Sequence, residues 1–159
     1  MNYFVRNMTN EIAKIVLEWK YEPPYDFYNS QVTKGNIAEL VEHGYYSVVD
    51  DKEQVVGFFC TGGAAQVPVG HLHGVYDGEF IDVGFGLRPE LTGKGYGYPF
   101  LQCILGFVET TFHQSRFRLT VAAFNERAIH LYKKAGFKPI ADFETETSDF
   151  IVMVKESES

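Results

Sequence analysis

The chain has 159 residues, 45% of them hydrophobic, which is typical of a single globular domain large enough to bury a core. Its net charge of −7, without a basic block, makes nucleic-acid binding a poor hypothesis, because that binding depends on neutralising phosphates with Lys and Arg. No apolar run reaches the roughly 18–20 residues that span a bilayer, the N-terminus has no signal-peptide layout, and the 2 cysteines make no disulfide framework. We therefore expect a protein of the reducing cytoplasm with no membrane segment.

The first part of the chain predicts short strands and short helices. Asn10 and Asn36 are the expected helix N-caps, because an Asn side chain can accept a hydrogen bond from the exposed N–H groups of a first turn. The buried face of the first helix is expected to carry Ile12, Ile15, Val16 and Trp19. The predicted elements are a strand at residues 1–6, a helix at 10–20, an aromatic stretch at 19–28, a helix at 36–44, and a hairpin of strands at 45–49 and 55–61.

The second part predicts a mixed sheet with helices on both faces. Residues 62–78 contain five glycines and two histidines, and they are expected to form a long loop of the kind that is often functional. Asn125 is the expected N-cap of the last helix and Gly136 its left-handed stop. The other predicted elements are strands at 80–87, 117–121, 137–140 and 150–154, a helix at 95–111, and a frayed tail at 155–159. In the strand at 117–121, Arg118 and Thr120 alternate with apolar residues, as in a half-buried strand.

A glycine-rich turn, Gly93-Lys94-Gly95-Tyr96-Gly97, connects a predicted strand to a predicted helix. Glycines in this position let successive backbone N–H groups point into one concavity, and the helix start adds partial positive charge, so the turn can hold a pyrophosphate. The spacing fits neither the Walker pattern nor the dinucleotide fingerprint. From this turn alone, a flexible connection with no ligand is an equal alternative.

The strand before the turn places Asp82, Gly84 and Gly86 on one face. Two glycines on one face of a core strand mark a bulge or a close approach, and an open face of this kind could take a ligand's amides as a substitute neighbour. Asp82 would then lie at the mouth of a cleft.

Residues 81–137 resemble the GNAT superfamily of acetyl-CoA-dependent N-acetyltransferases. The family's glycine signature, Gln/Arg-x-x-Gly-x-Gly/Ala, falls on Thr92 to Gly97, with Thr92 in place of the usual Gln or Arg. A second signature, Asn-x-x-Ala-x-x-Leu-Tyr-x-x-x-Gly-Phe, begins at Asn125 and matches at every position. The resemblance implies an α/β (α+β) fold with a mixed, mostly antiparallel sheet of six to seven strands in one domain, residues 1–159. The aromatic stretch at 19–28 is similar to that of the aminoglycoside-acetyltransferase-like branch.

The resemblance implies direct transfer of an acetyl group from acetyl-CoA to an amine in a ternary complex. Tyr132 matches the family's general acid, which protonates the leaving sulfur. A carboxylate near the open strand can accept the amine's proton, directly or through water, and Asp82 is the first candidate because of its strand face, with Glu79 second. The expected cofactor-binding residues are the backbone of Phe85 and Leu87, the turn Thr92, Gly93, Lys94, Gly95, Tyr96 and Gly97, and the helix residues Asn125 and Ala128.

Three questions about partners stay open in the sequence. The acceptor is expected to be a small-molecule amine, and the alternatives are a non-catalytic acyl-CoA-binding module or an enzyme that acetylates protein N-termini or lysines. The spacing of His71 and His73 allows a metal pair, but without a third ligand no metal is expected. Dimers are common in the family, so a homodimer is the oligomer to test.

Overall fold

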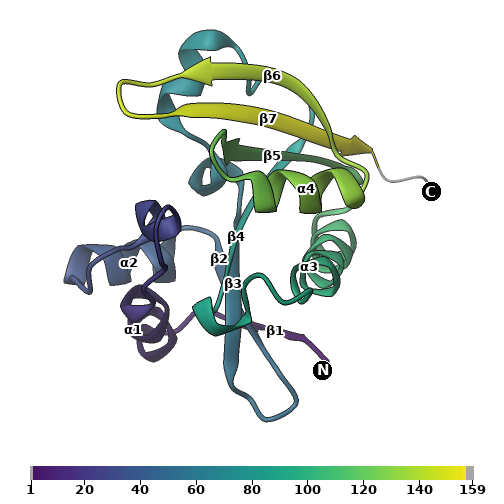
Figure 1. The fold of residues 1–159 in the computed structure, drawn as a ribbon. Helices are drawn as coiled ribbons and strands as arrows, with labels where there is room; N and C mark the ends of the chain where they lie inside the picture. The colour runs from purple at the N-terminus through teal and green to yellow at the C-terminus, as the bar shows by residue number, and fades with distance from the viewer. Residues whose placement is uncertain (1, 157–159) are drawn as a thin grey trace. The chain divides into compact units, whose positions relative to one another are not determined.

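The computed structural model describes residues 2–156 and divides into two compact units (Figure 1). The first unit holds the described residues up to Cys60 together with Phe85–Ile104, and the second holds Thr61–Gly84 together with the described residues from Leu105 onward. The strands are β1 (Phe4–Asn7), β2 (Tyr45–Val49), β3 (Val55–Thr61), β4 (Ile81–Leu87), β5 (Arg116–Ala122), β6 (Lys138–Glu144) and β7 (Asp149–Glu156). The helices are α1 (Asn10–Glu18), α2 (Lys34–Glu42), α3 (Gly97–Phe112) and α4 (Glu126–Lys134), with 3-10 turns at Tyr25–Tyr28, Gly62–Ala65, Pro68–His73 and Pro89–Leu91.

The strands form a seven-stranded sheet in the order β1-β2-β3-β4-β5-β7-β6. The pairs β1–β2, β2–β3, β5–β7 and β6–β7 are antiparallel, whereas β4 and β5 run parallel, with Ile81 opposite Phe117 and Asp82 opposite Arg118. A parallel pair needs a crossover connection, and the 16-residue helix α3 lies between these two strands in the sequence. The expected mixed, mostly antiparallel sheet is confirmed.

In the first unit, helices cover both faces of the sheet. Successive strand residues point to opposite faces of the sheet, so Gly57 lies on one face of β3 and Phe58 on the other. Phe58 packs against the cluster of buried residues from α1 and α2, whereas a Cβ built on Gly57 would lie 2.3 Å from the Phe100 ring of α3. The glycine therefore lets the α3 ring lie directly against the strand backbone.

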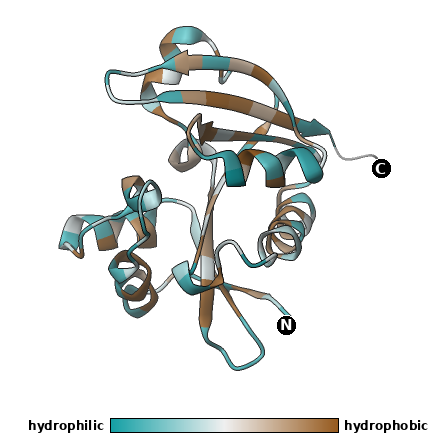
Figure 2. Ribbon diagram, in the orientation of Figure 1, coloured by the Kyte–Doolittle hydropathy of each residue, from teal (hydrophilic) through white to brown (hydrophobic). Residues whose placement is uncertain are grey.

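In the second unit, the core lies along the central strands β5 and β7. Phe117 and Leu119 of β5 and Val152 and Met153 of β7 are all buried. Helix α4 is amphipathic, with Tyr132 buried and its lysines exposed, and Figure 2 shows a mostly hydrophilic α4 next to hydrophobic stretches of β5 and β7. In the described part of the chain, no helix combines the length and the apolar character needed to cross a membrane.

Several predicted boundaries are wrong by a few residues. Thr9 and Thr33, not Asn10 and Asn36, cap α1 and α2, each accepting a hydrogen bond from the backbone N–H three residues later. The first turns therefore begin earlier than the Asn signals indicated. Ile15, predicted on the buried face of α1, is 44% exposed because Ala13, Val16 and Leu17 form the buried face instead.

Two longer segments also differ from the prediction. Residues 62–78 form the expected long connection between β3 and β4, and the difference is that it contains the 3-10 turns Gly62–Ala65 and Pro68–His73. The predicted tail at 155–159 is wrong at its start, because β7 continues through Glu156 and its residues pair with β5. Residues 157–159 of that predicted tail lie outside the described part.

Candidate active site

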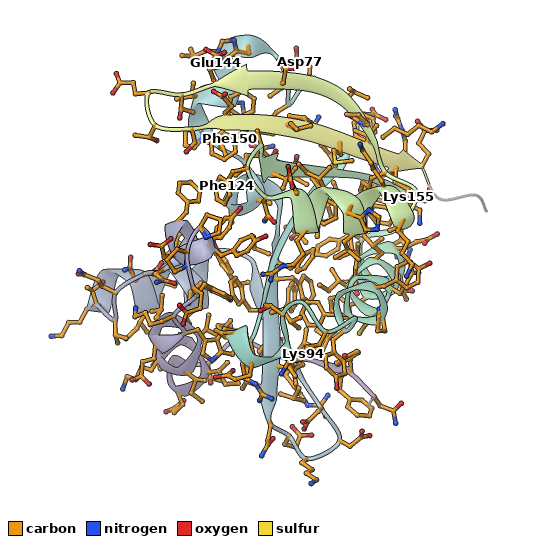
Figure 3. The ribbon with its side chains drawn as sticks, viewed as in Figure 1. Asp77, Lys94, Phe124, Glu144, Phe150 and Lys155 are labelled. Carbon is orange, nitrogen blue, oxygen red and sulfur yellow. The ribbon has the colours of Figure 1, made fainter. Side chains whose placement is uncertain are left out.

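The glycine turn belongs to the first unit and has the backbone conformation that its sequence indicated. Gly93 and Gly95 have φ values of 71° and 85°, in the left-handed region that favours glycine. The backbone N–H and the hydroxyl of Thr92 both donate to the Pro89 carbonyl, at 3.2 and 2.7 Å, so this side chain serves the turn itself. A Cβ built on Gly95 would meet no atom within 4 Å. The turn therefore borders open space and leads directly into α3, with Lys94 exposed (Figure 3).

The C-terminal end of β4, also in the first unit, is held by aromatic side chains. A Cβ on Gly86 would lie 2.4 Å from the Phe58 ring, so this glycine permits the close approach of a ring. The expected open glycine face is thus wrong at Gly86, because Phe58 covers it. On the next residue, the Tyr21 hydroxyl donates to the Leu87 carbonyl at 2.8 Å, and the Phe85 ring packs on Phe100 at 5.6 Å.

The second signature forms the helix α4 of the second unit. The Asn125 side chain accepts a hydrogen bond from the Ala128 N–H at 3.1 Å, which confirms the predicted cap. Gly136 has the predicted left-handed conformation with a φ of 98°. Tyr132 is buried, its ring lies 6.0 Å from that of Phe137, and its carbonyl accepts the Phe137 N–H. The motif therefore fixes both ends of the helix that carries Tyr132.

Asp82, in the second unit, is buried and paired with a buried arginine. Its Oδ1 accepts a hydrogen bond from Arg118 Nε at 2.7 Å, and its Oδ2 accepts from Arg118 Nη2 at 2.8 Å and from Gln66 Nε2 at 2.8 Å. Glu79, by contrast, is exposed. The prediction that Arg118 lies on the outward face of a half-buried strand is wrong, because only 2% of it is exposed.

Arg118 also holds the segment that precedes β4. Its guanidinium donates to the carbonyls of Val75, Tyr76 and Asp77, and it lies 5.2 Å and 5.4 Å from the ring centroids of Tyr76 and Phe80. A buried arginine is stable only when its donors are satisfied, and here one carboxylate and three carbonyls accept from them. The sequence signal was an arginine between Phe117 and Leu119 with an Asp on a nearby strand, which alternation alone cannot distinguish from a surface arginine.

Gln66 extends this cluster to an exposed histidine. His71 Nε2 lies 2.8 Å from Gln66 Oε1, and the His71 ring lies 5.0 Å from the Tyr76 ring. His73 instead stacks on Phe143 at 5.9 Å, so the two imidazoles have different partners. Among residues 2–156, no three His, Cys, Asp or Glu side chains gather as metal ligands would.

Burial raises the pKa of three side chains in the first unit, Cys103, Tyr45 and Tyr3. Cys60 is buried and Cys103 half-buried, and neither forms a disulfide. Burial raises the pKa of the Cys103 thiol, which disfavours the thiolate that a nucleophile needs. Burial also raises the pKa of Tyr45, with smaller contributions from Cys60 and Glu39, and the pKa of Tyr3.

The candidate residues are thus divided between the two units. The first unit contains Phe85, Leu87 and the turn from Thr92 to Gly97. The second unit contains Glu79, Asp82, Asn125, Ala128 and Tyr132. Sequence reasoning did not find Tyr21, Gln66 or Arg118, whose side chains bond to candidate residues.

Comparison with known proteins gives a family match and structural relatives. The profile of the acetyltransferase (GNAT) domain family matches residues 6–138. The chain is 22% identical over 136 residues to the spermidine N(1)-acetyltransferase of Vibrio cholerae serotype O1, an alignment that covers 84% of this chain and 71% of that protein.

Two solved structures show the likeness of the fold. A GNAT-family acetyltransferase from Bacillus anthracis has a TM-score of 0.74 at 14% identity, covering 98% of this chain and 95% of that one. The aminoglycoside acetyltransferase AAC(6')-Ib in complex with coenzyme A has a TM-score of 0.70 at 16% identity, covering 98% and 95%.

Proposed function

The chain belongs to the GNAT acetyltransferase family and is an N-acetyltransferase, and from this premise we propose that it acetylates a primary amine of a small molecule with acetyl-CoA. The observation that carries the proposal is the glycine turn, with two left-handed glycines at the start of α3. Transfer takes place directly between the two substrates in a ternary complex. The family match includes residues of both units, so we propose that they form one catalytic domain.

The residues of the turn fit the phosphates of acetyl-CoA. Left-handed glycines orient consecutive N–H groups toward one side, and the first turn of a helix contributes further unpaired N–H groups with partial positive charge. The open space beside Gly95 and the exposed ammonium of Lys94 supply room and charge for an anion. Because the Thr92 hydroxyl bonds to Pro89, backbone groups carry this role in place of the usual Gln or Arg side chain. We assign Asn125 and Ala128 to the same cofactor on the basis of the signature.

The end of β4 positions the acetyl group in this proposal. The backbone groups of Phe85 and Leu87 bind the extended arm of the cofactor, and an N–H of this segment donates to the thioester oxygen as negative charge develops there. A rigid donor is required for that role. The contacts of Gly86 with Phe58 and of Leu87 with Tyr21 support it, because they fix the strand at this point.

The proton transfers are assigned to side chains of the second unit. Tyr132 protonates the departing sulfur. Of the two carboxylates, Glu79 is exposed to solvent and can exchange a proton with it. Asp82 would have to accept a proton while its oxygens accept hydrogen bonds from Arg118, which would leave a buried arginine without its counter-ion. We therefore propose Asp82 as a positioning residue and keep Glu79 as the carboxylate candidate for the base.

The acceptor is proposed to be a cationic small molecule. The chain carries a net charge of −7, which favours cations over anions near its surface. The relatives named above are enzymes for spermidine and for aminoglycosides, which are amines. A protein N-terminus or lysine as the acceptor remains the alternative outcome of an acceptor screen.

Calorimetry of the purified protein with acetyl-CoA tests the cofactor site. The wild type should bind, and Gly95→Glu should abolish binding by placing a carboxylate among the phosphates. The control is Gly62→Glu, because Gly62 also has a positive φ of 72° and nothing within 4 Å of its Cβ direction. If the two variants lose binding equally, the glycine turn is not the site. A wild type that binds but acetylates no amine, with free thiol as the readout, would be a non-catalytic acyl-CoA-binding module.

A further inference from the structure

A chain of hydrogen bonds in the second unit connects a buried ion pair to an exposed imidazole. Arg118 donates to both oxygens of Asp82, at 2.7 and 2.8 Å. Gln66 Nε2 lies 2.8 Å from Asp82 Oδ2, and Gln66 Oε1 lies 2.8 Å from His71 Nε2. Each link has the length of an ordinary hydrogen bond. The chain therefore runs without a break from Arg118 to His71.

The chemistry of each group fixes the direction of every bond. An ionised carboxylate only accepts, so the amide nitrogen of Gln66 must point toward Asp82. The amide oxygen of Gln66 then points toward His71 and can only accept. His71 must therefore carry its proton on Nε2, and in the neutral ring the basic lone pair is on Nδ1. The buried ion pair thus sets the tautomer of an exposed histidine through one glutamine.

We propose that His71 Nδ1, in place of the exposed Glu79 carboxylate, is the general base that removes the proton of the acceptor amine, and that Gln66, Asp82 and Arg118 are its positioning residues. The proposal rests on the N-acetyltransferase function proposed above. An ammonium cannot attack a thioester, because its lone pair is bound to a proton. His71 Nδ1 takes that proton, the neutral amine nitrogen forms its bond to the acetyl carbon, and the carbon–sulfur bond breaks with the electrons staying on sulfur. The sulfur takes a proton from Tyr132, and the new amide nitrogen releases its second proton to solvent, from which Tyr132 is reprotonated.

The hydrogen-bond chain is compatible with both charge states of the base. When Nδ1 gains a proton, Nε2 keeps its own and continues to donate to Gln66, so no bond has to be rearranged. The His71 ring contacts the side chains of Gln66 and Tyr76. The next groups are Asp82 and Arg118, whose charges cancel. Histidine is also the side chain that exchanges protons most readily near neutral pH, whereas Asp82 is bound in its ion pair.

Nitrogen NMR of the imidazole tests the geometry without any activity. Spectra of the neutral ring should show His71 as the Nε2–H tautomer alone. In Gln66→Met, whose thioether sulfur is only a weak acceptor, the Nε2–H should exchange faster with water and a population of Nδ1–H should emerge. A wild-type ring with its proton on Nδ1 would overturn the proposal. The chain has five histidines, so the imidazole signals that are missing from the spectrum of His71→Gln are assigned to His71.

Kinetics test the chemical role. His71→Gln should lower kcat by about 10²-fold or more with an alkylamine acceptor, the usual contribution of a general base, and should leave KM for acetyl-CoA unchanged. The loss should be smaller with an aromatic amine that is already neutral at pH 7. His73→Gln should retain wild-type rates, because that ring stacks on Phe143.

The outcomes separate this proposal from the previous one. If the wild type acetylates amines and His71→Gln does so equally well, the base is elsewhere and the proposed function stands. If the wild type neither binds acetyl-CoA nor acetylates amines, the proposed function fails, whatever the tautomer of His71.

Discussion

At the scale of single residues, Arg118 has the greatest structural consequence. It is buried, pairs with Asp82 and donates to three backbone carbonyls. Arg118→Met should destabilise the protein by about 3–5 kcal/mol, because it leaves the Asp82 carboxylate buried without its counter-ion, with only the Gln66 amide still donating to it. The double variant Asp82→Asn/Arg118→Met should be less destabilised than Arg118→Met, because no charge then stays buried. Urea unfolding measures both values, and equal losses would contradict this account of the pair.

Tyr21 is a second residue with a structural role, because its hydroxyl group holds the end of β4. Its hydroxyl donates to the Leu87 carbonyl at 2.8 Å, and its backbone N–H donates to the Asn29 side chain at 2.7 Å. Tyr21→Phe removes only the first bond and should cost about 0.5–1.5 kcal/mol of stability. We expect kcat to fall severalfold while calorimetry finds unchanged affinity for acetyl-CoA, because the end of β4 becomes less rigid. An unchanged kcat would show that Leu87 needs no such support.

At the scale of elements, glycines in β4 and α3 make a matched pair of predictions. Gly86→Ala places a methyl group 2.4 Å from the Phe58 ring and should destabilise the protein by about 1–3 kcal/mol through overpacking. Gly106→Ala, inside α3 with nothing within 4 Å, should stabilise it by about 0.5–1 kcal/mol. Thermal unfolding of the two variants compares them directly. A shift of the same sign in both would contradict the packing argument.

Local patterns predicted the elements better than the contacts between them. The strand and helix types were predictable because apolar periodicity and caps such as Asn125 act over a few residues. The choice of Thr9 over Asn10 was not, because both side chains can cap and only the packing of α1 decides where its first turn lies. Phe58 over Gly86 and Arg118 on Asp82 join residues 28 and 36 positions apart, and no local pattern encodes such pairs. The glycine turn was predictable because its conformation is local.

At the scale of the whole molecule, the free energy of unfolding should fall as the pH rises into the alkaline range. Burial raises the pKa values of Tyr45 and Tyr3, so the folded protein keeps these protons to higher pH than the unfolded chain does. Above the ordinary phenol pKa of about 10, the unfolded state binds fewer protons, so the free energy of unfolding falls as pH rises. Below that pH the two phenols contribute no slope.

Tyr45→Phe tests this linkage. The variant should lose stability less steeply between about pH 9.5 and pH 11.5, since its side chain has no proton to release. Urea unfolding at pH 7 and at about pH 10.5 gives the comparison, with Tyr28→Phe at an exposed ring as the control. If the free energy of unfolding falls equally with pH in the wild type and in Tyr45→Phe, groups other than Tyr45 cause the loss of stability at alkaline pH.

The guanidinium of Arg118 also constrains the order in which the chain can fold. It bonds to carbonyls that precede it by 41 to 43 positions, so during synthesis those carbonyls leave the ribosome well before the side chain that will hold them. Contacts between distant positions form late because the intervening loop must close first. The segment that carries Gln66 and His71 therefore acquires its final geometry only after β5 has been made. A nascent chain that stops before Arg116 contains both residues but not the arginine that positions them.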